Sequence, residues 1–120
     1  MTEDPLGKKA ENLAQAFLGE RGLKVVAQNV RTEGGELDLV VMDGDVLVFV
    51  EVKGRTRLEF GLPEEYVDRR KRQRLASAAQ AYLNRLPGPR PSCRFDVVAV
   101  DFSRNTPALR HIKDAFRPGD

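Results

Sequence analysis

Apolar residues in the first part of the chain recur every three or four positions, a spacing that places them on one face of a helix. The residues of this face are Ala10, Leu13, Ala14, Phe17 and Leu18. Gly22 follows them, and glycine is common where a helix ends. The pattern therefore predicts a helix from about Leu6 to Arg21, with Glu11 at the edge of its apolar face.

The pattern then changes to a period of two, which is typical of β-strands. We expect strands at residues 23–28, 36–41 and 46–53. Asp43 and Gly44 lie between the last two, and this dipeptide is a strong signal for a tight β-hairpin. A hairpin from residue 36 to residue 53 is therefore predicted at the centre of the chain.

Helical spacing returns after Pro63 and predicts a second helix from there to about Leu86, where Pro87-Gly88-Pro89 ends it. A Val-rich strand over residues 94–102 and a short strand over residues 109–112 complete the chain. The predicted order is α-β-β-β-α-β-β. It indicates an α/β fold with a central mixed β-sheet flanked by helices, formed by one domain over residues 1–120.

The hairpin separates apolar from charged positions. With Asp43 and Gly44 as the central turn residues, Asp38 faces Phe49 and Glu36 faces Glu51. One face is wholly apolar and must pack on a core; it comprises Leu37, Leu39, Val41, Val46, Val48, Val50 and Val52. The other face is apolar near the turn and charged at its far end; it comprises Glu36, Asp38, Val40, Leu47, Phe49, Glu51 and Lys53.

Three carboxylates at one end of a sheet face repel one another, and a divalent cation would relieve that repulsion. Asp38 and Glu51 are the candidate ligands for Mg²⁺ or Mn²⁺, with the carbonyl of Val52 as a third protein ligand. Lys53 would then orient or deprotonate an attacking water, or stabilise charge on a phosphate. The alternative is a cross-strand cluster of ion pairs on a solvated face.

Glu11 is a further candidate ligand, directly or through water, because a carboxylate at the edge of the helix can overhang the rim of the sheet. The alternative is an ordinary glutamate at the boundary of an apolar face, which is the commoner case.

Charge adds one more candidate surface. The net charge is only +2, but Arg69, Arg70, Lys71, Arg72 and Arg74 are crowded together in the second helix. Such a stripe can hold a phosphate backbone, although a solvated helix face is the simpler interpretation. We select Arg69, Arg70 and Arg72 as candidate contacts to nucleic acid.

The remaining composition excludes other classes. The single cysteine, Cys93, rules out an intramolecular disulfide and a cysteine-based metal site. No apolar run is long enough to span a membrane, and the N-terminus lacks the apolar core of a signal peptide. We therefore expect a cytoplasmic protein without a membrane partner.

Several segments together resemble the YraN family of uncharacterised bacterial proteins. They are Gln28-Asn29-Val30-Arg31, Gly35-Glu36-Leu37-Asp38-Leu39-Val40, Leu47-Val48-Phe49-Val50-Glu51-Val52-Lys53-Gly54-Arg55, Phe60-Gly61, Lys71-Arg72-Gln73-Arg74-Leu75, Arg94-Phe95-Asp96-Val97-Val98-Ala99-Val100 and His111-Ile112-Lys113-Asp114-Ala115-Phe116. The resemblance covers nearly the whole chain, and the combination of segments is specific where any one alone is weak.

That family is similar to the archaeal Holliday-junction resolvases and to the PD-(D/E)xK nucleases. The resemblance implies a resolvase-like (restriction-endonuclease-like) core and a catalytic set of Glu11, Asp38, Glu51 and Lys53. Leu37 stands where the superfamily has its proline, which carries no chemistry.

The resemblance also suggests Gln73 as a polar residue that completes the site. Arg55 and Arg57 follow the Glu-x-Lys motif and are candidate phosphate contacts, with a solvated loop as an equal alternative.

The implied function is a Mg²⁺- or Mn²⁺-dependent endonuclease that hydrolyses DNA, with branched or junction DNA as a candidate substrate. Cleavage of a junction needs two active sites, hence a homodimer. Two alternatives stay open: a non-catalytic nucleic-acid-binding module on the same fold, and an adaptor in a DNA-processing assembly.

Overall fold

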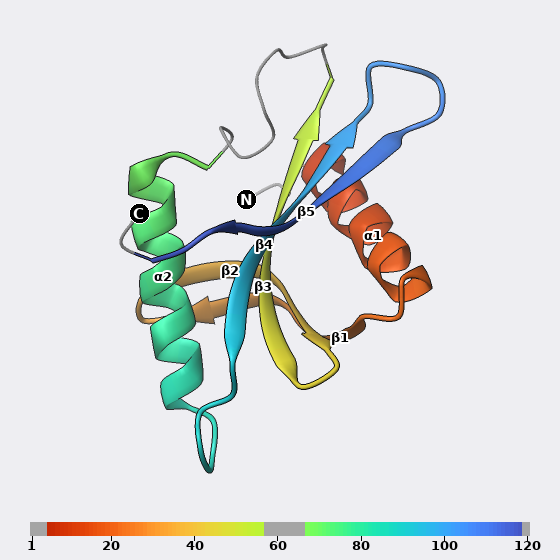
Figure 1. Cartoon of the computed structure of the whole chain (residues 1–120). Coiled ribbons are helices and arrows are strands. Elements are labelled where there is room, and N and C mark those ends of the chain that lie inside the picture. The colour runs from red at the N-terminus through yellow and green to blue at the C-terminus, as the bar shows by residue number, and fades with distance from the viewer. Residues whose placement is uncertain (1–4, 57–66, 119–120) are drawn as a thin grey trace.

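A computed structural model of the chain describes residues 5–56 and 67–118 (Figure 1). Its elements in order are α1 (Pro5–Glu20), β1 (Lys24–Thr32), β2 (Gly35–Asp43), β3 (Val46–Arg55), α2 (Arg69–Asn84), β4 (Cys93–Asp101) and β5 (Ala108–Phe116). This is the predicted order, and β5 is longer than expected. None of the helices in the described ranges is long and apolar enough to cross a membrane.

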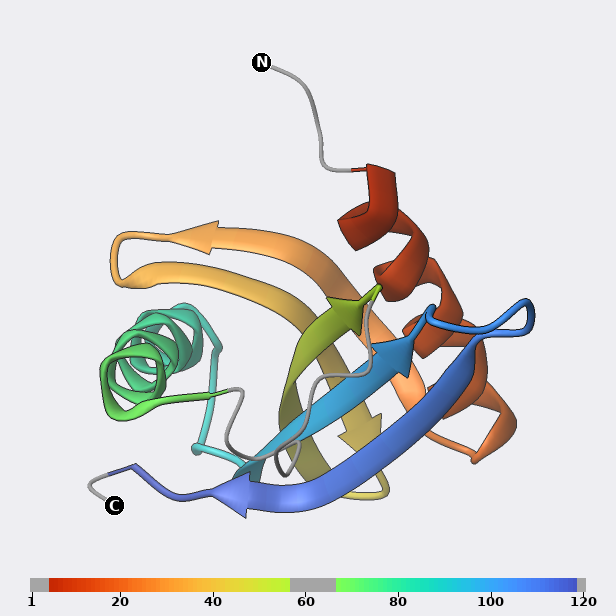
Figure 2. The same cartoon turned by 90° about the horizontal axis from the view of Figure 1, so that it is seen from above.

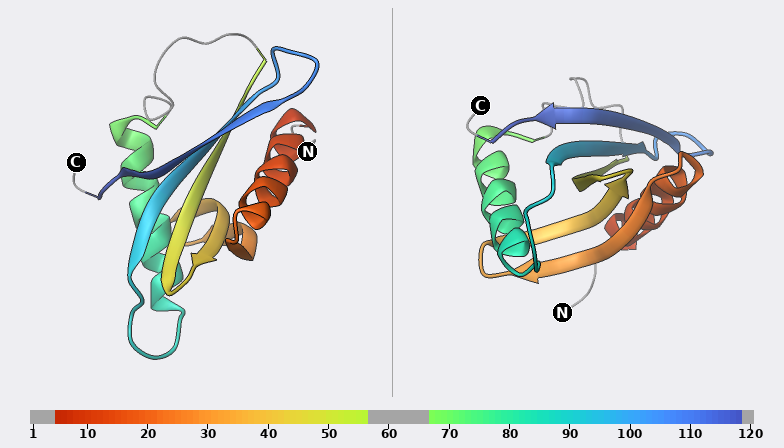
Figure 3. Two further views of the ribbon diagram at one scale, coloured as in Figure 1. Left: turned by 45° about the vertical axis from the view of Figure 1, so that its right-hand side comes forward. Right: turned by 60° about the horizontal axis from the view of Figure 1, so that its bottom comes forward.

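The strands form one mixed sheet in the order β1-β2-β3-β4-β5. Neighbouring strands are antiparallel except β3 and β4, which are parallel because α2 carries the chain back between them. The helices cover opposite faces, and β1 and β2 curl from α1 towards α2 (Figures 2 and 3). The α/β prediction of a mixed sheet flanked by helices is confirmed.

Each helix covers its own hydrophobic core. The α1 core consists of Ala10, Ala14, Leu18, Leu23, Leu39, Val41, Val48, Val50, Val98 and Val100. The α2 core consists of Leu37, Val40, Leu47, Phe49, Val67, Leu75, Ala78, Ala79, Phe95, Val97 and Phe116. The sheet is thus apolar on both faces along most of β3, which leaves polar chemistry to the ends of the strands.

The predicted hairpin register is wrong by two residues. Asp43 pairs with Val46 and Val40 with Phe49, so Gly44 and Asp45 are the central turn residues. Gly44 adopts φ 60, a left-handed conformation that glycine tolerates without strain. Because side chains alternate with a period of two, a shift of two residues leaves each side chain on its predicted face.

Leu37 is the exception to the predicted faces, since it packs in the α2 core and not with Leu39. The β2–β3 pairing ends at Leu39 and Val50, beyond which β2 continues only with β1. Asn29 of β1 adopts φ 49 at this point. The irregular backbone and the curl of the β1–β2 hairpin turn Leu37 towards α2.

The second helix begins later than predicted. Residues 63–66 lie outside the described residues, and Val67 and Asp68 precede the helix. Asp68 is its N-cap, with ψ 176, and its side chain accepts a hydrogen bond from the Lys71 N–H at 2.9 Å. An aspartate in this position satisfies an N–H that the first turn leaves without a helical partner, and it thereby sets the helix start at Arg69.

Asp96 is fully buried and serves the fold. It accepts hydrogen bonds from Arg94 and from the Asp114 N–H, and His111 Nε2 lies 2.8 Å from its Oδ2. Burial by itself would raise the pKa of Asp96, but the hydrogen bonds from His111, Arg94 and the Asp114 N–H hold it below its usual value. Asp96 is therefore a buried carboxylate held by its partners within the fold.

Candidate active site

The site lies where β2 separates from β3. Asp38 directly precedes Leu39, the first residue of β2 that pairs with β3, and its Oδ2 accepts a hydrogen bond from the Val52 N–H of β3 at 2.9 Å. A side-chain oxygen therefore takes the place of the next ladder carbonyl. Asp38 is thus held across the gap between the strands, on the side of Glu51 and not opposite Phe49 as predicted.

Glu51 is buried, with 4% of its surface exposed, and two ammonium groups lie near the same carboxylate oxygen. Lys71 Nζ of α2 is 3.1 Å from Glu51 Oε2, and Lys53 Nζ of β3 is 3.8 Å from it. A buried carboxylate is stable only when paired, and these two lysines supply the pairing. Both keep part of their side-chain surface exposed, so both remain accessible from solvent.

Asp38 and Glu51 interact unfavourably as two anions. Burial, the charge of Glu51 and a side-chain hydrogen bond to Glu51 raise the pKa of Asp38 from 3.8 to about 7, against the lowering effects of the Val52 N–H and Lys71. Near neutral pH, Asp38 is therefore partly protonated. A cation bound between the two carboxylates would favour their ionised forms and release that proton.

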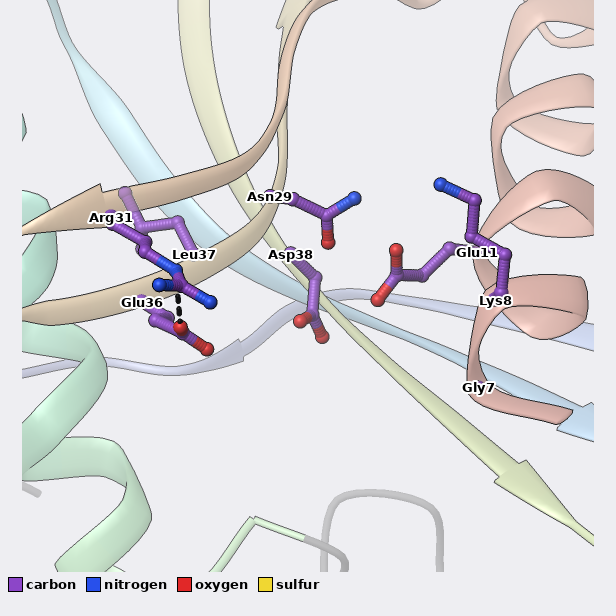
Figure 4. Close-up of a pocket in the computed structure, with 8 residues that line it drawn as sticks. All are labelled: Gly7, Lys8, Glu11, Asn29, Arg31, Glu36, Leu37 and Asp38. Carbon is purple, nitrogen blue, oxygen red and sulfur yellow. Dashed lines mark ion pairs between the residues drawn. The ribbon is translucent and has the colours of Figure 1, made fainter. Parts of the chain in front are cut away.

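A cavity of about 350 Å³ opens beside Asp38, between α1 and the β1–β2 hairpin (Figure 4). Its lining residues are Gly7, Lys8, Glu11, Asn29, Arg31, Glu36, Leu37 and Asp38. The Glu11 carboxylate extends from α1 towards Asp38. Glu36 is exposed and paired with Arg31 at 3.0 Å, which removes it from the carboxylate pair.

Gly54 explains how α1 brings Glu11 to the cavity. A Cβ at Gly54 would lie 3.3 Å from the Ala10 Cβ, closer than ordinary van der Waals contact. The absence of a side chain there lets the N-terminal half of α1 pack closely on the end of β3. The position of Glu11 relative to Glu51 and Lys53 on β3 thus depends on this close contact between Gly54 and Ala10.

Lys71 is the site residue that the sequence reasoning missed. It lies one helical turn before Leu75, which is buried in the α2 core, so the two share the face of α2 that meets the sheet. That spacing was visible in the sequence. The five adjacent basic residues suggest a single charged stripe, and that pattern conceals the different direction of Lys71.

The other basic candidates separate into different roles. Arg69 and Arg70 are exposed at the start of α2. Arg72 is half-buried: its Nε donates to the Val67 carbonyl at 2.8 Å, and its guanidinium lies over the Phe116 ring at 5.6 Å. Arg72 therefore anchors the start of α2 on β5, and its contact with nucleic acid stays a prediction.

The remaining candidates lie at the margin. Gln73 is exposed, and two positions after Lys71 it points to another side of the helix, about 200° away. Arg55 ends β3, is half-buried, and its carbonyl accepts the Phe102 N–H at 2.7 Å. Arg57 lies outside the described residues.

The donor set suits a hard cation only in part. Within residues 5–56 and 67–118, no three His, Cys, Asp or Glu side chains are close enough together to hold a metal ion. The two contacting carboxylates, with Glu11 facing Asp38 across the cavity, provide oxygen ligands of the kind that Mg²⁺ and Mn²⁺ take. Val52 contributes its N–H to Asp38, while a role for its carbonyl stays a prediction.

Comparisons with known proteins identify relatives along almost the whole chain. A family model described as "Uncharacterised protein family UPF0102" matches residues 10–100, a range that includes Glu11, Asp38, Glu51, Lys53 and Lys71. A UPF0102 protein of Halorhodospira halophila is 48% identical, over 92% of this chain and 86% of the relative. Those of Anaeromyxobacter dehalogenans and Chlorobaculum tepidum are 46% and 40% identical, over 95% and 96% of this chain and 88% and 94% of the relatives.

Proposed function

The chain belongs to the UPF0102 family, also called YraN, and we propose that it is a metal-dependent endonuclease that hydrolyses DNA phosphodiester bonds. The observation that carries the proposal is the contact between half-buried Asp38 and buried Glu51, with two lysines near Glu51. A group of acids next to cations at the rim of a sheet is costly for a purely structural role. It suits a site that receives both a cation and a phosphate.

Each site residue would have a role that follows from its chemistry. Asp38 and Glu51 would hold Mg²⁺ or Mn²⁺, and Glu11 would add a ligand from α1, directly or through water. The bound cation would activate water and neutralise charge on the phosphate. Lys53 Nζ, at the exposed edge of the pair, would orient the attacking water or donate hydrogen bonds to the phosphate oxygens.

DNA is the proposed polymer because exposed cations lie near the site. Arg69 and Arg70 occupy the first turn of α2, where the helix dipole also favours anions. Binding through such contacts weakens steeply with salt. Branched or junction DNA and a homodimer, which would present two sites to two strands, are the finer parts of this proposal.

The test is cleavage of junction, flapped and linear DNA with Mg²⁺ or Mn²⁺. Glu51→Gln and Lys53→Ala should each lower the rate at least about a hundredfold, a loss on the scale of removing one electrostatic catalytic group. Glu33→Gln and Lys113→Ala are matched controls, because both side chains are exposed and neither contacts Glu51.

Binding of DNA by the wild type without cleavage under any of these conditions would support the alternative of a non-catalytic binding module. Equal cleavage by the wild type and the site variants would assign the activity to a contaminant. Either result would overturn the enzyme proposal.

A further inference from the structure

The basic residues of α2 point in different directions although they are adjacent in sequence. Arg69, Arg70 and Arg74 are exposed, whereas Lys71 turns towards the sheet in line with Leu75. The Asp68 cap receives the Lys71 N–H and so fixes where this residue stands at the start of the helix. The direction of Lys71 is therefore set by the helix start and not by its charged neighbours.

Lys71 makes the shorter of the two lysine contacts to Glu51, 3.1 Å against 3.8 Å for Lys53, and both reach the same oxygen, Oε2. An ammonium at this oxygen occupies part of the space and the charge that a divalent cation would use. Lys71 also keeps 32% of its side chain exposed, so its ammonium can turn from Glu51 to a ligand in solvent.

We propose that Lys71 is an exchangeable counter-ion of Glu51 that couples phosphate binding to metal binding. The inference rests on the proposed function. In the metal-free protein Lys71 neutralises Glu51. A phosphodiester bound at the site attracts the Lys71 ammonium, and Glu51 then becomes available to the cation. Metal and DNA thus bind cooperatively, and by thermodynamic reciprocity each raises the affinity for the other by the same factor.

The coupling also follows from the burial of Glu51. With 5% of its side-chain surface exposed, this carboxylate needs a positive partner in every state. Lys71 and the metal supply that partner in turn, while Lys53, on the same strand as Glu51, stays near it in both states. The arrangement lets a cation enter without leaving a buried anion uncompensated at any step.

The experiment measures Mn²⁺ affinity by calorimetry, with and without a short phosphorothioate duplex that resists cleavage. The variants are Lys71→Gln and Lys71→Arg, with Lys113→Gln as a matched exposed lysine. Wild type should bind Mn²⁺ more tightly when the duplex is present. Without DNA, Lys71→Gln should bind Mn²⁺ about threefold to tenfold more tightly than wild type, since one charge pair no longer competes.

The distinguishing result is the loss of coupling. In Lys71→Gln the duplex should change Mn²⁺ affinity less than about twofold, while Lys113→Gln keeps the wild-type response. Lys71→Arg retains the charge and should restore weaker Mn²⁺ binding with coupling. Unchanged or weaker Mn²⁺ binding by Lys71→Gln, or coupling that persists in it, overturns the proposal, as does a wild type that binds no Mn²⁺.

The outcomes separate this inference from the proposed function. Coupled binding of Mn²⁺ and DNA without cleavage of unmodified DNA would support the role of Lys71 and refute the nuclease. If the protein cleaves DNA but its Mn²⁺ affinity is the same with and without the duplex, the nuclease proposal is supported and the role of Lys71 is refuted.

Discussion

Replacing Asp38 with asparagine should stabilise the metal-free protein. The substitution keeps the shape of the side chain and an oxygen for the Val52 N–H, and its amide can donate a hydrogen bond to Glu51. It removes the negative charge that burial and Glu51 oppose. We therefore expect an inactive variant that folds more stably than the wild type, as often happens when a strained functional group is removed.

The size of the effect follows from the pKa. The pKa of Asp38 is 3.8 in the unfolded chain and about 7 in the folded protein, so the folded state binds more protons than the unfolded state between these two pH values. The contribution of Asp38 to stability is therefore fully present below about pH 4 and is lost as pH rises through about 7. At about 1.36 kcal/mol per pKa unit, the cost of ionising Asp38 in the fold approaches about 4 kcal/mol at pH 8, as an upper bound.

Chemical denaturation at pH 4 and pH 8 in a metal chelator measures this difference. Asp38→Asn should exceed the wild type by about 2–4 kcal/mol at pH 8 and by less than about 1 kcal/mol at pH 4, where the wild-type carboxyl is protonated. Glu36→Gln is the control, because Glu36 is exposed and should contribute less than about 1 kcal/mol at either pH.

Metal ions supply the second arm of the same experiment. Mn²⁺ should raise the melting temperature of the wild type and of Glu36→Gln at pH 8, and it should leave Asp38→Asn unchanged. Asp38→Asn that is less stable than the wild type at pH 8, or equally stabilised at pH 4 and pH 8, would refute the reasoning about a repulsive carboxylate pair. An equal Mn²⁺ response in Asp38→Asn would refute Asp38 as a ligand.

Two further substitutions test the packing and the basic surface. Gly34→Ala should destabilise the fold by about 3 kcal/mol or more, because its Cβ would lie 2.3 Å from the Ser77 carbonyl oxygen. Gly19→Ala is the control: nothing lies within 4 Å of its Cβ and the residue is helical, so thermal melts should show no loss of stability. A Gly34→Ala variant that melts at the wild-type temperature would contradict the close contact. Arg70→Ala should weaken DNA binding and lower the salt slope by about 1 without loss of stability, whereas Arg72→Ala should cost about 1 kcal/mol of stability by loss of its hydrogen bond to a backbone carbonyl. DNA titrations at several salt concentrations and denaturation curves separate these roles, and the reverse assignment of the two arginines would show that the contacts of Arg72 do not matter.

The basic segment shows where sequence reasoning stops. Its composition indicates a surface for phosphate, and the exposed positions of Arg69 and Arg70 agree with that indication. Its helical spacing also predicts which way Lys71 points, because Lys71 lies four residues before buried Leu75 and so shares its face of the helix. The structural role of Arg72 depends on its contacts with the Val67 carbonyl and the Phe116 ring. Phe116 is distant in sequence, so no local pattern predicts this role.

The sequence by itself determined the order of the elements and most of the faces of the central hairpin. Both depend on local periods of 3.6 and 2, and a register error of two residues leaves a strand face unchanged. It also identified Asp38, Glu51 and Lys53 as neighbours on one charged edge, which the structure brings together.

Only the tertiary structure decided how the negative charges of Asp38 and Glu51 at that edge are compensated. Asp38 reaches the Val52 N–H because β2 pairs with β3 only from Leu39 onward, and Glu51 is paired because α2 places Lys71 beside it. The raised pKa of Asp38 is a property of burial by these separate elements, since desolvation depends on everything packed around a group. A period along the chain specifies which way a side chain points, but not what another part of the chain places against it.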